Sequence, residues 1–244
     1  MFQISLIMNK RKIFGHLCIR LGIDFYCPKC QGSNIIKSGL TIKKKQRYFC
    51  KECKKRFVKE YVYKAYNPSL NKKIITLTKE GLGIRSTARI LKISTTTLMK
   101  RIIMISKSIK QTAISTGKSY EVDEMRIFIG SKKRMRWIVY ALDRENKSVV
   151  SFNIGRRTNS TLKKVIQTLE QSRAKKIYTD KLKNYLYLID KKLHCSKHRS
   201  TNHIERHNLT LRTHLKRLNR KTICFSRSTL MLNSIMKIYF WAEN

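Results

Sequence analysis

Two Cys-x-x-Cys pairs constrain the fold of this 244-residue chain more tightly than any other feature of its sequence. Cys27 and Cys30 form the first pair, Cys50 and Cys53 form the second, and 19 residues separate the two pairs. Each pair turns tightly enough for both thiolates to reach one ion, and four thiolates complete the closed tetrahedral shell that Zn²⁺ prefers in structural sites. The spacing therefore predicts a zinc ribbon over residues 26–62. Because that segment has little other core, we expect bound Zn²⁺ to supply most of its folding free energy.

The cysteine count and the N-terminal segment favour a reducing compartment. Seven cysteines are an odd number, and four of them have ligand spacing, so a disulfide framework is disfavoured. Residues 1–25 form an N-terminal extension that Lys and Arg interrupt and that lacks the cleavage site of a signal peptide; a translation start at Met8 is an alternative. No apolar run approaches the roughly 18 residues of a membrane span. We therefore expect a cytoplasmic protein with no membrane partner.

The net charge of +41, from 55 Lys and Arg against 14 Asp and Glu, indicates a polyanionic partner. So large a charge repels itself, and the release of counterions from phosphates would drive binding to nucleic acid. The alternative is a solvated lysine-rich surface. A protein of this kind would associate with the nucleoid. The stretch "TIKKKQRYFC" between the cysteine pairs is basic and strand-forming, and we expect four of its residues to face DNA phosphates: Lys43, Lys44, Lys45 and Arg47.

Residues 63–112 read as three short helices, in "SLNKKIITLTKEG", "IRSTARILK" and "STTTLMKRIIMISKSI". Ser94 or Thr95 is a candidate N-cap of the third helix. Two helices joined by a short turn, the second rich in Ser, Thr and Lys at its start, are typical of a helix-turn-helix DNA-binding domain. An ordinary three-helix packing unit is the alternative. The third helix, as recognition helix, would place four residues near base edges or phosphates: Thr95, Thr96, Thr97 and Lys100.

Residues 118–244 have a different character, with three strands, a helix, a further strand and then helices. The strands are expected in "SYEVDEMRIFIG", "MRWIVYALDRENKSVVSFNIG", which turns at "DRENK", and "AKKIYTD". This element order predicts an α/β domain with a ribonuclease-H-like fold. Apolar residues recur at helical spacing in two segments. They are Leu162, Val165, Ile166 and Leu169 in the first, and Ile204, Leu211, Leu215 and Leu218, with Asn208 among them, in the second.

Carboxylates gather in the first of these strands, in a chain that is otherwise poor in acid. Alternation along a strand places Asp123 on the same face as Glu121 and turns Glu124 the other way. In the predicted fold the strand that ends at Asp180 lies beside the first strand, and Glu205 follows on a long helix. Three carboxylates from two strands and a helix can hold two Mg²⁺ or Mn²⁺ ions, which suit the in-line displacement of phosphoryl groups. We expect Asp123, Asp180 and Glu205 to be ligands; the expectation that Glu121 and Glu124 are not ligands rests on the motif resemblance given below.

Other polar residues of this section are expected to have supporting roles. Arg212 lies two helical turns after Glu205 on the same face, where it suits a phosphate clamp. Asp143 and Asp190 are expected in turns or loops, and Glu170 on a solvated helix face. A histidine-rich stretch would line a DNA groove or support the carboxylates, with a second zinc site as the alternative; it contains His194, Cys195, His198, His203 and His207.

Several of these motifs together resemble the insertion-sequence-one family of transposases. "QRYFCKECKKRF" and "GLGIRSTARILKISTTTL" are similar to the zinc-ribbon and helix-turn-helix half of that family. "VDEM", "RWIVYALDR", "RTNSTL", "YTD", "IERHNLTLRTHLKRLNRK" and "FSRS" are similar to its catalytic half. The resemblance covers roughly residues 26–240, and "YTD" and "IERHNLTLR" in this order are its most specific part.

The resemblance implies a DDE-type transposase with a ribonuclease-H-like catalytic domain over residues 118–244. It assigns the catalytic Asp, Asp and Glu to Asp123, Asp180 and Glu205, and the following basic residue to Arg212. It also implies cleavage at terminal inverted repeats and joining of the freed 3′-hydroxyl to target DNA. Synapsis of two DNA ends would require a homodimer or a larger assembly. Many members of the family join the two halves by frameshifting, whereas here one continuous frame encodes both.

Two other functions are compatible with the same residues. A zinc-ribbon and helix-turn-helix repressor with an inactive catalytic half would need no carboxylates. A structure-specific nuclease would need them but would transfer no strand. Intact Asp123, Asp180 and Glu205 favour the transposase.

Overall fold

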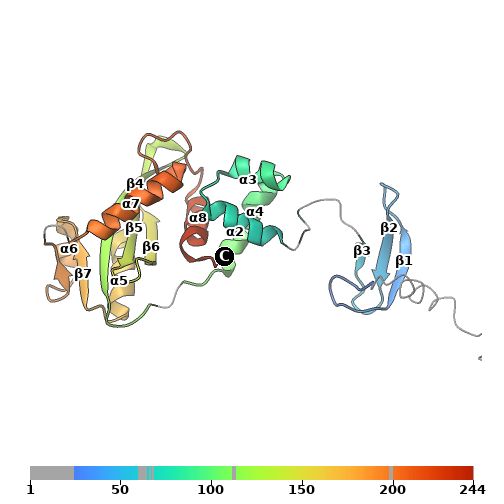
Figure 1. Ribbon diagram of the computed structural model, residues 1–244, viewed down its shortest axis with the longest axis horizontal. Helices are drawn as coiled ribbons and strands as arrows, with labels where there is room; N and C mark the ends of the chain where they lie inside the picture. Colours follow the sequence, from blue (N-terminus) through green and yellow to red (C-terminus); the bar gives the residue numbers. More distant parts are fainter. Residues whose placement is uncertain are drawn as a thin grey trace, which may run out of the picture. The chain divides into compact units, whose positions relative to one another are not determined.

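The computed structural model describes residues 25–59, 65, 67, 69–111, 114–197 and 200–243. The chain divides into two compact units, residues 1–63 and residues 64–244, each of which is described by itself (Figure 1). Nearly all of the N-terminal extension, Met8 included, lies outside the described residues, and so does His198. No helix in the described ranges has both the length and the apolar character needed to cross a membrane.

The first unit contains a three-stranded antiparallel sheet in the order β1-β2-β3. Its strands are β1 (Ile35–Leu40), β2 (Gln46–Cys50) and β3 (Arg56–Val58). Its buried core consists of Cys27, Cys50 and Phe57, against which a few partly buried side chains pack. A core this small agrees with the expectation that this segment depends on something other than apolar burial for its stability.

The second unit begins with three helices, α2 (Leu70–Lys79), α3 (Ile84–Leu91) and α4 (Thr95–Ser108). Ser94 is the N-cap of α4, and its hydroxyl accepts the backbone N–H of Thr97 at 3.1 Å. The turn that joins α3 to α4 contains Lys92 in a left-handed conformation, with φ 53°. The predicted limits of these helices are confirmed to within a residue or two, since the sequence marks them with glycines and with the capping serine.

A mixed five-stranded sheet follows, in the order β6-β5-β4-β7-β8. An antiparallel meander is formed by β4 (Ser119–Ile129), β5 (Ser131–Asp143) and β6 (Val149–Gly155). On the other side of β4, β7 (Lys176–Thr179) pairs with it in parallel. The short strand β8 (His194–Cys195) in turn pairs in parallel with β7. The predicted order of three strands, a helix and a strand is confirmed. The predicted turn at "DRENK" is also confirmed: the Asp143 carboxylate accepts the backbone N–H of Glu145 at 2.8 Å.

Helices cover both faces of this sheet (Figure 1). α5 (Asn159–Gln171) and α6 (Lys183–Leu188) pack on one face. α7 (Asn202–His214), the short 3₁₀ helix η2 (Lys216–Leu218) and α8 (Thr229–Trp241) pack on the other. The apolar positions predicted at helical spacing are all buried: Leu162, Val165, Ile166, Leu169, Ile204, Leu211, Leu215 and Leu218. The second predicted helical segment is interrupted, since α7 ends at His214 and Leu218 lies in η2.

The C-terminal helix α8 contributes to two cores at once. Leu232 and Met236 pack with the sheet, while Ile235 and Ile238 pack with α2, α3 and α4. The hydroxyls of Ser106 on α4 and Ser234 on α8 are hydrogen bonded at 3.0 Å. The three-helix segment and the sheet are therefore parts of one compact unit, with α8 packed between them (Figure 1).

Candidate active site and metal-binding centres

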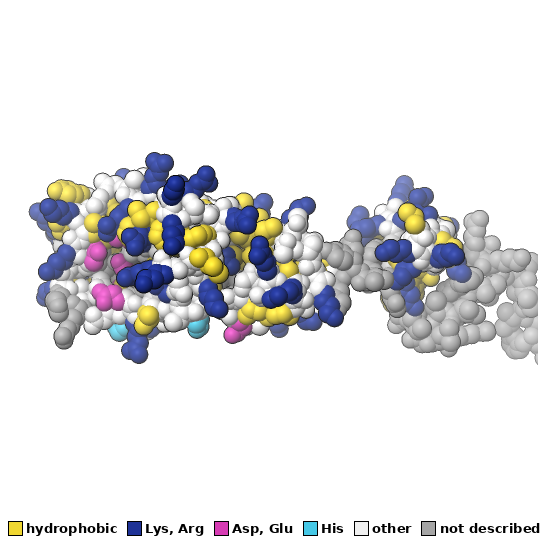
Figure 2. Space-filling model, turned by 90° about the horizontal axis from the view of Figure 1, so that it is seen from above, with side chains coloured by type: hydrophobic (Ala, Val, Ile, Leu, Met, Phe, Trp, Pro, Cys, Tyr) yellow, Lys and Arg dark blue, Asp and Glu magenta, His cyan; other side chains and the backbone are white. Residues whose placement is uncertain are grey.

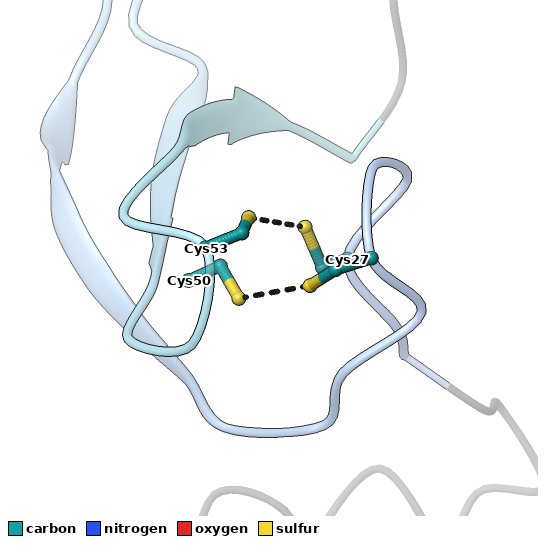
Figure 3. Close-up of side chains that lie close together, drawn as sticks. Cys27, Cys50 and Cys53 are labelled. Atoms are coloured by element: carbon teal, nitrogen blue, oxygen red, sulfur yellow. Dashed lines mark hydrogen bonds between the residues drawn. The ribbon is translucent and has the colours of Figure 1, made fainter.

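The four cysteines of the first unit converge on one point. The sulfur atoms of Cys27 and Cys53 lie 3.5 Å apart, and those of Cys30 and Cys50 lie 3.6 Å apart. All four sulfurs lie within 4.8 Å of one another. Figure 3 shows the side chains of Cys50 and Cys53 pointing toward Cys27 from the opposite loop. Four sulfurs at these separations match the donor set of a tetrahedral thiolate site.

The two cysteine loops share one backbone conformation. Gln31 and Lys54 each follow the second cysteine of a pair, and each has a left-handed conformation, with φ 59° and 55°. The backbone N–H of Cys27 and that of Cys50 each donate to the carbonyl five residues later, at 3.0 and 2.9 Å. Sequence analysis missed these turns, because neither position holds the glycine that usually marks a positive φ.

Charge crowding in this cluster favours a bound cation. Burial raises the pKa of the Cys27 thiol, but backbone N–H groups of Cys30 and Lys29 and neighbouring sulfurs outweigh it and lower the pKa to about 6. The backbone N–H of Gly32 lowers the pKa of Cys30, but burial and three neighbouring sulfurs raise it to about 12. The Cys30 thiol therefore needs a cation to offset the neighbouring charge before it ionises, and the donor set of the four cysteines fits Zn²⁺.

In the second unit, the open edge of β4 brings carboxylates together. The parallel pairing of β4 with β7 runs from Ser119↔Lys176 to Val122↔Thr179, and β7 ends there. Asp123 is the next residue of β4, and Asp180 is the first residue after β7. Carboxylate oxygens of Asp123 and Asp180 lie within 4.8 Å of each other. The structure thus brings together the two aspartates that the predicted strand order places side by side.

Glu124 lies in the same group, contrary to the expectation that strand alternation would separate it from Asp123. One of its oxygens also lies within 4.8 Å of Asp123 and Asp180. Its other contacts are on the opposite face of the sheet, where it accepts the Tyr185 hydroxyl and pairs with Arg157 at 3.1 Å. Since β7 has ended, no neighbouring strand separates the two faces at this edge, and both side chains can approach Asp180.

Glu205 is not part of this group of carboxylates in the described structure. It is exposed on α7, and its carboxylate accepts the Thr201 hydroxyl at 3.0 Å. Glu205, Asn208 and Arg212 lie at positions i, i+3 and i+7, so they share one face of the helix. Glu205 therefore lies one turn from Asn208, and its assignment as a metal ligand stays a prediction.

Asn208 contacts Asp123 directly and was not identified as a functional residue from the sequence. Its amide Nδ2 donates to Asp123 Oδ2 at 2.7 Å, while the backbone N–H of Glu124 donates to Asp123 Oδ1, also at 2.7 Å. The sequence feature that indicates such a role is an amide side chain on the apolar stripe of α7, between Ile204 and Leu211. A buried amide needs hydrogen-bonding partners, so its place on that stripe indicates a polar neighbour.

A buried glutamate positions α7 against β4. Glu121 is fully buried, and its carboxylate accepts the backbone N–H of Ile204 at 2.9 Å in the first turn of α7. It also forms an ion pair with Arg144, at 3.0 Å. The guanidinium of Arg144 lies over the Tyr178 ring of β7. A carboxylate at a helix N-terminus is favourable because backbone N–H groups there lack partners within the helix. Glu121 thus orients the helix that carries Glu205.

Arg212 has an unpaired donor beside the carboxylates. Its Nε is buried and has no hydrogen-bond partner in the part of the chain that is described. Burial and the charge of Arg220 lower the pKa of Arg212, and the charge of Asp123 opposes them. A guanidinium with a free donor and a cationic neighbour suits an anionic ligand such as a phosphate.

The histidines do not form a second metal centre within the residues described. His194 Nε2 lies 2.7 Å from the Thr179 hydroxyl, and His207 Nδ1 lies 3.1 Å from the Tyr140 hydroxyl. His203 is exposed. His194 thus contacts the strand that Asp180 follows, whereas His207 contacts Tyr140 on β5, and the role of the histidines beside the carboxylates or DNA stays a prediction.

The residues expected to contact DNA lie on accessible surfaces of both units. Lys43, Lys44 and Arg47 are exposed at or beside the β1–β2 turn, and Lys45 is half-buried. On α4, Thr95, Thr96 and Lys100 are exposed, and Thr97 is half-buried against its cap. In the view of Figure 2, many Lys and Arg side chains are visible. Few acidic side chains are visible, and most of them lie in one small group.

Comparison with known proteins identifies relatives for much of the second unit. Residues 118–243 match the family model described as IS1 transposase, and residues 61–103 match the model described as InsA C-terminal domain. "Insertion element IS1 protein InsB" of Shigella flexneri is 39% identical over 119 residues, which are 49% of this chain and 91% of that protein. "Insertion element IS1 2 protein InsB" of Escherichia coli (strain K12) is 40% identical over 119 residues, covering 49% of this chain and 71% of that protein.

Two retroviral structures show weak similarity. The HTLV-2 integrase catalytic core domain in complex with magnesium has a TM-score of 0.32 and 14% identity, over 52% of this chain and 86% of that one. The simian T-cell lymphotropic virus intasome in complex with PP2A regulatory subunit B56 gamma has a TM-score of 0.31 and 14% identity, over 58% of this chain and 59% of that one.

The electrostatics of Asp123 predict a pH-dependent stability for the metal-free protein. Burial raises the pKa of Asp123 from 3.8 to about 6, helped by the charges of Glu124 and Asp180 and opposed by the N–H donors of Glu124 and Asn208. Ionisation of Asp123 therefore costs folding free energy progressively from about pH 4 to pH 6, and the full cost is present above that window. We expect Asp123→Asn to raise the melting temperature at about pH 8 and to have little effect at about pH 4.

Thermal unfolding in the presence of a chelator, followed across this pH range, measures the effect. Asp190→Asn is the matched control, because Asp190 is exposed and only accepts the backbone N–H of Lys192 in a loop. Equal destabilisation by Asp123→Asn at both pH values would contradict the expected cost of ionising Asp123. Added Mg²⁺ should stabilise the wild-type protein at about pH 8 and leave Asp123→Asn unchanged.

Proposed function

Since this chain belongs to the IS1 transposase family, we propose that it binds the terminal inverted repeats of a mobile element and cleaves and transfers their strands at a ribonuclease-H-like active site. The family is of the DDE type and carries a helix-turn-helix DNA-binding domain, here matched over residues 61–103. The observation that carries the proposal is the meeting of Asp123 and Asp180 at the open edge of β4, inside the segment that matches the family.

The proposed metal site consists of Asp123, Asp180 and Glu205, which would hold Mg²⁺ or Mn²⁺. Bound divalent ions supply activation of an attacking water or 3′-hydroxyl and neutralise charge on the leaving oxygen. Oxygen donors from carboxylates are the ligands that these hard ions prefer. Glu205 has an exposed side chain held by the Thr201 hydroxyl, so a change of rotamer can redirect its carboxylate toward the aspartates.

The remaining residues of the site would position the DNA. The unpaired Nε–H of Arg212 would donate to a phosphate oxygen next to the scissile bond. Because guanidinium remains charged and only donates, Arg212 would bind phosphate rather than metal. Glu121 would contribute by holding α7 in place through the Ile204 N–H.

Substitution of the carboxylates should separate cleavage from DNA binding. We expect Asp123→Asn, Asp180→Asn and Glu205→Gln each to lower cleavage of a labelled end substrate by orders of magnitude, because each removes charge needed to bind the cation. Binding to end DNA, measured by gel shift, should survive. Asp190→Asn, the exposed loop carboxylate, should retain both activities.

The alternatives predict other outcomes in the same assay. Full cleavage by Asp123→Asn, or equal loss of binding and cleavage, would contradict the proposed catalytic role of Asp123. Absence of cleavage by the wild-type protein, with DNA binding intact, would favour a repressor with an inactive catalytic half. Cleavage without joining to a labelled target duplex would favour a nuclease.

We also propose that the first unit is a zinc ribbon with one structural Zn²⁺ on its four cysteines. Its support is the cluster of four sulfurs within 4.8 Å on a sheet with a very small core.

Cys50→Ser should abolish stoichiometric zinc and unfold the ribbon, because metal binding supplies folding free energy to such a domain. Cys224→Ser, an exposed cysteine outside the cluster, is the control and should retain zinc. Metal analysis of the purified protein measures both variants, and absence of stoichiometric zinc in the wild-type protein would refute the assignment.

The helix-turn-helix should read sequence, and the ribbon should hold phosphates. We expect Thr96→Val to reduce the preference for end DNA over random DNA, since the exposed Thr96 hydroxyl lies at the start of the proposed recognition helix. Alanine at Lys43, Lys44 and Lys45 should weaken binding to all sequences and reduce the salt dependence by about 0.9 per lost phosphate contact. Gel shifts at several salt concentrations with both kinds of DNA test this. An equal loss on every DNA for Thr96→Val would show that α4 does not read bases.

The proposed function has consequences for assembly and location. Synapsis of two element ends would require at least a homodimer. The double-stranded partners would be the element ends and the target DNA, and the cytoplasmic nucleoid is where a bacterial protein meets them.

A further inference from the structure

A buried polar chain connects the core of the sheet to Asp123. Tyr140, fully buried on β5, places its hydroxyl 2.8 Å from Oδ1 of Asn208 on α7. The other end of the Asn208 amide, Nδ2, lies 2.7 Å from Asp123 Oδ2. His207 Nδ1 lies 3.1 Å from the Tyr140 hydroxyl on its far side. Four side chains from β4, β5 and α7 thus form one hydrogen-bonded series that ends on a carboxylate of the proposed active site.

The chemistry of the groups fixes the direction of every hydrogen bond. An ionised carboxylate only accepts, so the Asn208 NH₂ must face Asp123 and its carbonyl oxygen must face Tyr140. The carbonyl oxygen also only accepts, so the Tyr140 hydroxyl donates to it at 2.8 Å; a longer contact, 3.3 Å, joins the same hydroxyl to the Ile204 carbonyl. His207 Nδ1 then donates to the Tyr140 oxygen. The donors thus point toward Asp123, whose charge sets which way the Asn208 amide is turned, and the Tyr140 hydroxyl holds the oxygen end of that amide.

We propose that Asn208, with its amide oxygen held by Tyr140, is a positioning residue that holds the Asp123 carboxylate in the orientation required to bind metal. The inference rests on the proposed function of Asp123 as a metal ligand. It goes beyond that function because it identifies which groups orient the ligand, and none of them is an acid or a member of the catalytic triad.

The geometry at Asp123 supports this role. The Glu124 N–H holds Oδ1 and the Asn208 amide holds Oδ2, both at 2.7 Å, so the carboxylate plane cannot rotate. Each carboxylate oxygen has further lone pairs, which remain available to a cation. Without Asn208, only the Glu124 N–H would hold the group. Groups that orient a metal ligand typically contribute about 10- to 100-fold to metal affinity or activity.

The position of Asn208 argues against a purely structural role. It is buried on the stripe of α7 between Ile204 and Leu211, where a leucine would pack without needing partners. A buried amide is costly unless both of its ends are hydrogen bonded, and here the two partners are Tyr140 and the Asp123 carboxylate. An apolar residue would serve the core equally well but would leave Asp123 Oδ2 without its donor.

The first variant tests the group that holds the amide oxygen. Tyr140→Phe removes one oxygen atom, retains the ring in the core and leaves Asn208 in place. The Asn208 amide then keeps its donor on Asp123 but loses the hydrogen bond on its oxygen, so the amide is held less firmly and orients the carboxylate less well. Tyr120→Phe is the matched control: Tyr120 is also fully buried in the same sheet, and its hydroxyl donates to the Ser115 carbonyl at 2.9 Å.

The second variant tests the donor itself. Asn208→Leu keeps the branched shape of the side chain and the helix but removes the N–H that faces Asp123. Asn153→Leu is its control, because the Asn153 amide is half-buried on β6 and donates to the Thr161 carbonyl at 3.1 Å, in contacts that do not include Asp123. Circular dichroism and thermal unfolding identify any variant that fails to fold. If Asn208→Leu fails to fold, Tyr140→Phe still decides the question.

Direct binding of Mn²⁺ to the zinc-loaded full chain is measured through the loss of the electron paramagnetic resonance signal of the free ion. Cleavage of end DNA is assayed in parallel. We expect Asn208→Leu to weaken Mn²⁺ binding by about 10- to 100-fold and Tyr140→Phe to weaken it in the same direction by a smaller factor. Both controls should match the wild-type protein. Cleavage by the two test variants should recover as the Mn²⁺ concentration is raised, because the acid itself is intact.

The outcomes separate this inference from the proposed function. If Asp123→Asn abolishes Mn²⁺ binding while Asn208→Leu and Tyr140→Phe bind as the wild-type protein does, the positioning role is wrong and the proposed function stands. If Asp123→Asn itself leaves Mn²⁺ binding unchanged, both are wrong. Equal weakening in Tyr140→Phe and Tyr120→Phe would also overturn the inference, because it would show a general effect of losing a buried hydroxyl.

Discussion

The short parallel pairing of β4 with β7 is the constraint on which the active-site geometry depends. It spans four residue pairs and ends at Val122↔Thr179, although β4 continues to Ile129. Beyond that point this edge of β4 pairs with no strand among the described residues, and the next backbone contact along it is an isolated bridge between Ile129 and Ser226. Asp180 enters this opening directly from the end of β7. A longer β7 would have placed a paired backbone where the carboxylates now meet, so the length of one strand determines whether the site can exist.

Burial of acid in so basic a chain requires specific compensation, and each carboxylate on β4 obtains it differently. Glu121 has a helix N-terminus and Arg144. Glu124 has Arg157 and the Tyr185 hydroxyl. Asp123 has only two N–H donors and no ion pair among the described residues, and its pKa is raised to about 6. The least compensated carboxylate is therefore the one best suited to gain from a cation.

Much of this architecture follows from local patterns in the sequence, and the parts that do not follow have physical reasons. Strand order, the buried faces of α5 and α7, and the approach of Asp123 to Asp180 all derive from periodicity and from the chain order of the elements. The place of Glu124 could not be predicted, because it depends on the residue at which β7 ends. The left-handed turns at Gln31 and Lys54 carry no glycine signal. The helix α8 is apolar on nearly every side, which indicates burial without indicating which elements bury it.

The dual packing of α8 links DNA recognition to catalysis in mechanical terms. Because one helix contributes side chains to the core of α2–α4 and to the core of the sheet, relative motion of these two parts would expose apolar surface on α8. The hydrogen bond between Ser106 and Ser234, and those from Lys237 to the carbonyls of Ser106 and Ile109, would also break. DNA bound to α4 in the proposed manner would then lie at a fixed position relative to Asp123. Binding energy gained at the proposed recognition helix would thereby help to orient the scissile phosphate, which is how contacts remote from the reacting atoms raise the rate of a reaction.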